Sequence, residues 1–358
     1  IKFYLKMKKV LITGSSGLVG SECLDFFHKK KFKIYALDND YRSKFFGKAS
    51  STIKVKKFQR ASFKNVKFIN KNLLNYAFLE DFFKNNKFDL IIHAAAQPSH
   101  DWSAKDPILD YKVNALATIY LLDLTRKYSP KAVFIFSSTN KVYGDRPNSL
   151  KGLKELKKRY EVFNKGKLFS IDEEMSIDNS MHSPFGASKI SADISVQEYG
   201  KYFGIKTGIF RCGCITGPNH QGAELHGFLS YLVKCIIQNK NYNVYGYKGK
   251  QVRDNIHSKD LTNMFWQFYL NPGYGEVYNA GGGRNNSISI LEAIDTINDL
   301  ANLKWNKFQV KKEARSGDHI WYVTDFKKFK KKYPSWNLEH SNEFIIEQII
   351  KKFRSEIK

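Results

Sequence analysis

Three glycines near the start of the chain have the spacing of a phosphate-binding turn. Gly14, Gly17 and Gly20 follow the apolar run 10–12, which predicts a buried strand, and lead into a segment over 18–27 with helical apolar spacing. The first glycine allows a tight turn, the second lets the backbone approach a pyrophosphate, and the third lets the helix pack close to the strand. Free N–H groups at the start of that helix attract an anion. The turn therefore predicts dinucleotide binding.

An acidic residue follows the second predicted strand. The apolar run 33–37 ends in Asp38, about 20 residues after the glycines, where a carboxylate would bind the ribose of an adenosine. The same carboxylate would repel the 2′-phosphate of NADP, so it favours NAD. We expect cofactor contacts from Gly14, Ser16, Gly17, Leu18, Val19, Asp38, Asn39, Asn72, Leu73, Ala94, Ala95, Ala96, Asn114, Ser137 and Lys189. The three alanines follow a fourth predicted strand over 88–93, where close packing of a helix on the sheet explains small residues equally well.

Hydroxyl side chains follow the fifth predicted strand, which covers 132–136. Ligands of a doubly wound sheet bind beyond the carboxyl ends of its strands, so Ser138 and Thr139 are expected beside the pocket. Lys189 belongs to a helix expected over 183–203. A lysine beside the nicotinamide ribose would hold that ribose and lower the pKa of a neighbouring acid by its charge. A lysine on a solvated helix face is the alternative interpretation.

Strand and helix patterns alternate through the first half of the chain. This alternation predicts an α/β fold, a Rossmann-type doubly wound parallel sheet with a smaller α/β C-terminal lobe that binds substrate. The expected parts are an extension over 1–6 before a natural start at Met7, a NAD-binding domain over 7–216, and the substrate-binding lobe over 217–358. We expect the segment 251–270 to return to the first domain. The long polar insertion 146–178 is expected to cover the substrate or to form a contact between subunits.

The composition limits the classes of protein. The 358 residues are 42% hydrophobic and 15% aromatic, which excludes a disordered chain and allows a large core. No apolar run reaches the roughly 18 residues that cross a membrane, and the glycine turn interrupts the apolar run that a signal peptide would need. The formal charge of +25 comes mainly from scattered lysines, which solvated helix faces explain better than nucleic-acid binding does. The cysteines have no metal-ligand spacing, so we expect no metal and a cytoplasmic location.

Several motifs together resemble the extended short-chain dehydrogenase/reductase family. They are the glycine turn, the stretch 137–144 (Ser-Ser-Thr-Asn-Lys-Val-Tyr-Gly), the aromatic residue four positions before Lys189, and the segment 253–257 (Arg-Asp-Asn-Ile-His). Within this family, the segments 139–145 and 251–254 are similar to those of the CDP-paratose (CDP-tyvelose) 2-epimerases. The resemblance covers the chain apart from residues 1–6.

The resemblance implies an NDP-sugar epimerase that holds NAD tightly. The epimerase would supply a sugar for a surface polysaccharide. Such an enzyme removes hydride from a sugar carbon and returns it to the opposite face, while the diphosphate anchor stays fixed. Arg253 and Arg315 match the family's diphosphate-binding arginines, although each could form an interlobe salt bridge instead. The full set of implied substrate contacts is Gln97, Ser99, His100, Lys141, His182, Phe185, Asn219, His220, Glu224, Arg253 and Arg315. The resemblance also implies a homodimer.

One residue departs from the family pattern. The catalytic tyrosine of the family is Phe185 here, and a phenyl ring cannot transfer a proton. Another group could transfer it, with Tyr143, His182 and Cys214 as candidates. Alternatively, Thr139 relays the proton through water while Lys189 tunes it, or the protein binds its ligands without turnover. The expected catalytic residues are Thr139, Lys189, Tyr143 and Cys214.

Two other functions stay open at this stage. The same scaffold could carry out a different NDP-sugar reaction, such as 4-epimerisation or dehydration. The chain could also be a non-catalytic NAD-fold protein that binds RNA or a protein partner, which Phe185 and the positive charge suggest.

Overall fold

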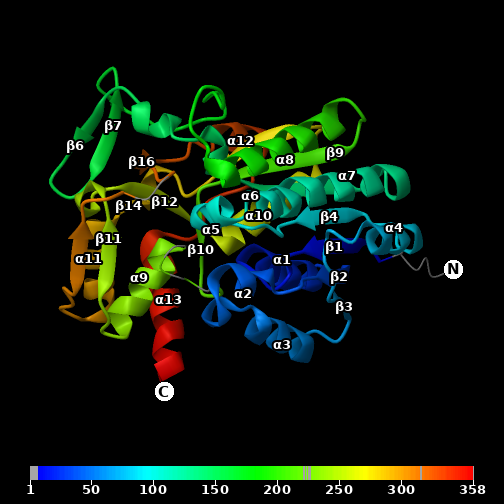
Figure 1. The fold of residues 1–358 in the computed structure, drawn as a ribbon, viewed down its shortest axis with the longest axis horizontal. Coiled ribbons are helices and arrows are strands. Elements are labelled where there is room, and N and C mark those ends of the chain that lie inside the picture. Colours follow the sequence, from blue (N-terminus) through cyan, green and yellow to red (C-terminus); the bar gives the residue numbers. More distant parts are fainter. Residues whose placement is uncertain (1–6, 221, 223, 225–226, 315–316, 358) are drawn as a thin grey trace.

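A seven-stranded parallel sheet forms the centre of the larger part of the molecule (Figure 1). The computed structural model describes residues 7–220, 222, 224, 227–314 and 317–357. The strands lie in the order β13-β9-β5-β4-β1-β2-β3. Strands β2 and β3 lie on one side of β1 and the later strands on the other, so the point where the strand order switches lies between β1 and β4. Their bounds are β1 Lys9–Thr13, β2 Lys33–Leu37, β3 Val66–Ile69, β4 Leu90–His93, β5 Val133–Thr139, β9 Lys206–Cys212 and β13 Glu276–Ala280. This order confirms the predicted doubly wound parallel sheet.

Helices cover both faces of this sheet because successive side chains of each strand point to opposite sides. Val10 and Ile12 of β1 pack with α1 (Leu18–Lys29), α10 (Ser258–Leu270) and α12 (Lys327–Lys332), whereas Leu11 packs with α4, α7 and α8 on the other face. These last helices span Tyr76–Asn85, Ala117–Tyr128 and Ser183–Lys201. Shorter helices join the strands: α2 Tyr41–Phe46, α3 Ile53–Ser62, α5 His100–Lys105 and α6 Pro107–Tyr111.

A smaller α/β lobe lies at the left of Figure 1. Its four-stranded sheet contains β10 (Cys214–Thr216), β12 (Val252–His257), β14 (Ser287–Ser289) and β16 (Trp321–Tyr322), and β11 (Tyr242–Tyr245) pairs with β15 (Phe308–Lys311). Helices α9 (Phe228–Ile237), α11 (Ile290–Ala301) and α13 (Asn342–Ile357) pack on one another through a separate apolar core. The chain returns to the large sheet with α10 (Ser258–Leu270) and stays there beyond 270, because β13 forms its edge beside β9, whereas β12 belongs to the smaller lobe's sheet.

The insertion 146–178 has its own secondary structure. It contains the antiparallel strands β6 (Leu153–Glu155), β7 (Tyr160–Asn164) and β8 (Lys167–Leu168). Val162 and Ile171 pack against Trp321, whose indole nitrogen donates to Glu161 Oε1 at 3.0 Å. Described residues of the insertion do not line the large cavity, and a cover over the substrate stays a prediction. A contact between subunits stays a prediction.

The end of the fifth strand differs from the sequence expectation. Strand β5 continues to Thr139, beyond the predicted end at 136, because it pairs with β9 up to the partners Thr139 and Cys212. Helix α7 begins at Ala117, directly after a π-helical turn over Lys112–Leu116.

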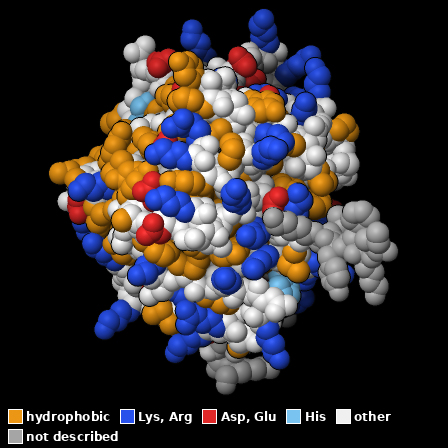
Figure 2. All heavy atoms as spheres, turned by 90° about the vertical axis from the view of Figure 1, so that its right-hand side faces the viewer, with side chains coloured by type: hydrophobic (Ala, Val, Ile, Leu, Met, Phe, Trp, Pro, Cys, Tyr) orange, Lys and Arg blue, Asp and Glu red, His pale blue; other side chains and the backbone are white. Residues whose placement is uncertain are grey.

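Charged side chains are dispersed over the molecular surface that Figure 2 presents. Lys and Arg side chains lie across this face with apolar and uncharged groups between them. Within the described residues, no helix combines the length and apolar character that a membrane span requires.

Candidate active site

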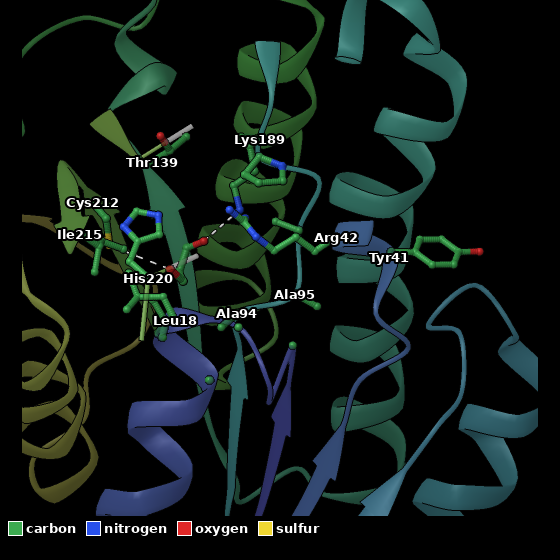
Figure 3. A pocket seen from close by; sticks show the side chains of 18 of the residues that line it. Leu18, Tyr41, Arg42, Ala94, Ala95, Thr139, Lys189, Cys212, Ile215 and His220 are labelled. Atoms are coloured by element: carbon green, nitrogen blue, oxygen red, sulfur yellow. Dashed lines mark hydrogen bonds between the residues drawn. The ribbon is translucent and has the colours of Figure 1, made fainter. Parts of the chain in front are cut away.

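A cavity of about 460 Å³ opens at the carboxyl ends of the parallel strands, between the large sheet and the smaller lobe. This is where a doubly wound sheet binds its ligand, and the volume is in the usual range for cofactor sites. In Figure 3, Thr139, Lys189, His220 and Arg42 surround the same space above the strand ends. Segments far apart in sequence therefore build one site.

The glycine turn lies at the floor of the cavity. Gly14 has φ +67°, and a Cβ atom there would lie 2.8 Å from the backbone of Ala95, so only glycine fits without displacement. Gly17 directly precedes α1 and lines the cavity, and a Cβ atom there would lie 3.3 Å from the Gly14 carbonyl oxygen. Asp38 follows β2, and its carboxylate accepts hydrogen bonds from the backbone N–H groups of Ser16 at 3.0 Å and Asp40 at 2.8 Å. This cradle fits the pyrophosphate and adenosine ribose of NAD.

Burial perturbs two charged groups beside this cradle. It raises the pKa of the Asp38 carboxyl against the effect of its two backbone hydrogen bonds. It also lowers the pKa of Arg42 to about 10, against the attraction of Asp40. Asn72 donates to the Tyr41 hydroxyl at 2.8 Å. The sequence predictions did not include Tyr41 and Arg42, which line the cavity. Their position three and four residues after Asp38 was a usable signal.

The opposite end of the cavity contains Thr139 and Lys189. Thr139 ends β5, and Lys189 reaches the cavity from α8, where its Nζ donates to the carbonyl oxygen of Ser137 at 2.9 Å. This Nζ also lies 4.1 Å from the ring centre of Phe136. Burial lowers the pKa of Lys189 to about 8, although Cys212, Asp193 and Asp110 favour its charged form. A buried cation at this point suits a ribose hydroxyl.

Phe185 occupies the cavity wall one helical turn before Lys189. Its ring meets the His100 imidazole edge to face, with centroids 5.1 Å apart and planes at 74°. Cys214 and Cys212 also line the cavity, and burial raises their pKa values to about 11 and about 12. Cys212 and Asp318 are further lining residues that the sequence predictions did not include.

Cationic side chains gather where the smaller lobe meets the cavity. Arg253 donates to Asp318 Oδ1 at 2.5 Å, and Lys141 Nζ donates to the Gly317 carbonyl oxygen at 2.8 Å. Burial acts to raise the pKa of Asp318, but Arg253 and Lys141 outweigh it and hold that pKa well below its ordinary value. Burial lowers the pKa of His220 to about 3, so this ring is neutral near pH 7. Arg253 thus forms an ion pair and also faces the cavity.

Most predicted site residues line this cavity. For the cofactor they are Gly14, Ser16, Gly17, Leu18, Val19, Asp38, Asn39, Asn72, Leu73, Ala94, Ala95, Ala96, Ser137 and Lys189. For substrate and catalysis they are His100, Thr139, Lys141, Phe185, Asn219, His220, Cys214, Glu224 and Arg253. Arg315 lies outside the described residues.

Gln97, Ser99 and Asn114 lie behind the cavity wall. Gln97 donates to Asp110 Oδ1 at 2.6 Å, and Asn114 donates to the same oxygen at 3.1 Å and to Ser188 Oγ at 3.1 Å. Ser99 caps α5 by accepting the backbone N–H of Trp102. These groups are almost fully buried and satisfy one another, so their placement contradicts the predicted ligand contacts.

Tyr143 and His182 also lie outside the set of described residues that line the cavity. The Tyr143 hydroxyl donates to Asn279 Oδ1 at 2.7 Å and accepts from Arg211 Nη1 at 3.3 Å. Burial raises the pKa of this hydroxyl to about 12. His182 Nε2 donates to the Ile177 carbonyl oxygen at 2.8 Å. Both side chains are therefore committed to the fold, and neither is placed to exchange a proton with a ligand.

One group of possible metal ligands lies elsewhere among the described residues, namely Asp260, Glu339 and His340. The Asp260 carboxylate accepts the backbone N–H groups of both other residues, and His340 Nδ1 lies 2.8 Å from its Oδ1. Hydrogen bonding within the chain accounts for this group. That the active site needs no metal stays a prediction.

The chain matches known proteins over most of its length. The model of the NAD dependent epimerase/dehydratase family matches residues 10–281. A CDP-paratose 2-epimerase from Salmonella typhi is 28% identical over 327 residues, which cover 89% of this chain and 92% of that protein.

Solved structures share the fold. A dTDP-glucose 4,6-dehydratase from Bacillus anthracis in complex with NAD has a TM-score of 0.77 at 22% identity, covering 97% of each chain. A UDP-glucose 4-epimerase from Thermotoga maritima with UDP-glucose has a TM-score of 0.76 at 22% identity, covering 98% of this chain and 100% of that one. The family match, together with the cradle at Gly14, Gly17 and Asp38, confirms the predicted family and its NAD cofactor. The chain belongs to the NAD-dependent epimerase/dehydratase family.

Proposed function

We propose that this protein is an NDP-sugar 2-epimerase whose substrate is a CDP-deoxyhexose such as CDP-paratose. One arrangement carries the proposal: Thr139 and Lys189 line the same cavity as the cations Lys141 and Arg253. A sugar anchored by its diphosphate at the cations would present its ring to Thr139. The similarity to a CDP-paratose 2-epimerase supports the choice of base and sugar.

In this reaction a sugar carbon is oxidised to a ketone, the sugar turns, and the carbon is reduced from its other face. Bound NAD would supply the hydride acceptor and donor for this carbon. Lys189 would hold the nicotinamide ribose, and Thr139 would hydrogen-bond the reacting sugar oxygen. The guanidinium of Arg253, which also pairs with Asp318, would bind the diphosphate. The keto-sugar intermediate would then stay in the cavity, because its diphosphate remains anchored.

Incubation of the purified protein with NAD and CDP-paratose tests the proposal. We expect a second CDP-hexose, resolved by NMR, and transient NADH absorbance. UDP-glucose and dTDP-glucose serve as comparison substrates, and mass spectrometry of copurifying nucleotide identifies the natural base. Conversion of UDP-glucose or dTDP-glucose without conversion of CDP-paratose would favour 4-epimerisation or dehydration instead.

The proposal includes a homodimer and a cytoplasmic location. Ile108 and Tyr111 of α6 and Ile194 of α8 are exposed, at 68%, 49% and 43%, and the Tyr111 hydroxyl lies 3.0 Å from Ser191 Oγ of α8. An apolar surface of this kind suits a second copy of the chain, and Ile194→Glu should shift the sedimentation coefficient towards that of a monomer. All four cysteines are free thiols, which suits a reducing compartment.

A further inference from the structure

The proposed reaction needs a group that exchanges a proton with the reacting sugar oxygen. Oxidation of a secondary alcohol to a ketone removes a hydride from carbon and a proton from oxygen, and the reverse step returns both. Phe185 has no exchangeable proton, although it lines the cavity one helical turn before Lys189. The proton must therefore pass through another group that faces the cavity.

We propose that His100 is the residue that takes and returns this proton. The assignment rests on the proposed function and names the acid/base group of the same site. His100 lines the cavity together with Thr139 and Lys189. Its ring packs edge to face with the ring of Phe185, at 5.1 Å between centroids. It thus lies beside the ring that replaces the tyrosine. Histidine ordinarily titrates near pH 6.5, so one imidazole can serve as base and as acid.

The imidazole is held in place from two further sides. Its Nδ1 lies 2.8 Å from the hydroxyl oxygen of Ser183, the first residue of α8. The backbone of Gly317, at φ +73°, approaches so closely that a Cβ atom there would lie 2.9 Å from the same nitrogen. A side chain fixed by Phe185, Ser183 and Gly317 has the defined orientation that proton transfer requires.

The remaining candidates fit this role less well. Tyr143 and His182 do not belong to the described lining of the cavity. Burial raises the pKa values of Cys212 and Cys214 to about 12 and about 11, which disfavours the thiolate that would accept a proton. Lys141 Nζ lies 3.9 Å from the Asp318 carboxylate, and the proposed function uses its charge at the diphosphate.

The step balances without another reactant. We assign the transfer to the imidazole of His100, because this ring lines the cavity. The sugar O–H bond breaks, its proton goes to the imidazole of His100, and its electron pair becomes the second bond of the carbonyl group. The two electrons of the C–H bond leave with the hydride. On return, the imidazolium gives its proton back to the carbonyl oxygen, so the histidine ends as it began.

His100→Gln in the full-length, NAD-loaded protein tests the assignment. Glutamine keeps hydrogen-bonding capacity but cannot carry the proton, so we expect the single-turnover rate with CDP-paratose to fall by about 100-fold or more. His182→Gln is the matched control, since His182 lies outside the described lining, and its rate should stay near that of wild type. Melting temperatures of both variants report whether the fold is intact.

A binding measurement tests the contact without turnover. Calorimetry compares the sugar nucleotide with its analogue that lacks the reacting hydroxyl, on wild type and on His100→Ala. The variant should weaken binding of the hydroxylated ligand by about 5- to 10-fold and leave binding of the deoxy analogue unchanged, because one hydrogen bond is lost. Equal weakening of both ligands would mean that His100 only shapes the cavity, and would overturn the assignment.

The two proposals fail in different ways. If wild type converts the sugar and His100→Gln converts it within about threefold, which is too small for a lost acid/base, the His100 assignment is wrong and the epimerase stands. If wild type neither binds nor converts any sugar nucleotide of the panel, the proposed function is wrong and the assignment falls with it.

Discussion

Two stacked tyrosines behind the cavity allow a test of which polar groups stabilise the fold. Tyr143 and Tyr322 are both fully buried, with ring centroids 6.5 Å apart. The Tyr143 hydroxyl donates to Asn279 at 2.7 Å and accepts from Arg211 at 3.3 Å. The Tyr322 hydroxyl has no hydrogen-bond partner within the described part of the chain. The same substitution should therefore have different effects at the two positions.

Tyr143→Phe removes two hydrogen bonds and leaves the Asn279 oxygen without its donor. The bond from Arg211 contributes about 1 kcal/mol and the unsatisfied Asn279 oxygen costs about 1–3 kcal/mol, so we expect a loss of about 2–4 kcal/mol in the free energy of unfolding. Tyr322→Phe removes a buried hydroxyl whose desolvation is not offset, so it should be neutral or stabilise by about 1 kcal/mol.

Equilibrium unfolding in urea measures both effects, with the slope checked for constancy. Turnover should stay within about twofold of wild type in both variants, because neither tyrosine belongs to the described lining of the cavity. Loss of a catalytic proton donor would instead lower the turnover rate by about 100-fold or more. Equal changes in the free energy of unfolding would refute the hydrogen-bond reasoning. A large loss of turnover in Tyr143→Phe at unchanged stability would show that Tyr143 takes part in the reaction.

Three further predictions concern the cavity wall and its support. Gly14→Ala puts a methyl group 2.8 Å from the Ala95 backbone at φ +67°, so it should cost about 2–4 kcal/mol in thermal unfolding and abolish NAD binding in calorimetry; retained binding would contradict the cradle. Asp193→Asn breaks a buried pair with Arg211, held at 3.0 and 3.1 Å, and should lower the unfolding free energy in urea by about 3–5 kcal/mol; a loss below about 1 kcal/mol would make the pair dispensable. Lys189 has its pKa lowered from 10.5 to about 8, so between these pH values the unfolded chain binds more protons than the folded one. The unfolding free energy of wild type should rise by roughly 3 kcal/mol over that range relative to Lys189→Met, and parallel pH curves would exclude the lowered pKa.

Local sequence patterns determined the first strands and the cofactor cradle. The predicted strand over 33–37 has the bounds of β2, because it is a short apolar run between polar turns. The turn at Gly14 and the acid at Asp38 are set by residues within one βαβ unit. The hydrogen bond from Ser16 to Asp38 spans only 22 residues, and the phosphate-binding spacing encodes it.

Only the tertiary structure decided which polar side chains face the ligand. Gln97 and His100 lie three residues apart, yet Gln97 is buried against Asp110 and His100 lines the cavity beside Phe185. In the same way, Tyr143 follows Thr139 by four residues but points to Asn279, which is 136 residues away in sequence. Apolar periodicity and turn chemistry depend on neighbouring residues, whereas the partner of a buried polar group comes from a distant segment. The local pattern could therefore predict the sheet and its phosphate turn, and the packing of α8 and the smaller lobe against that sheet decided the rest of the site.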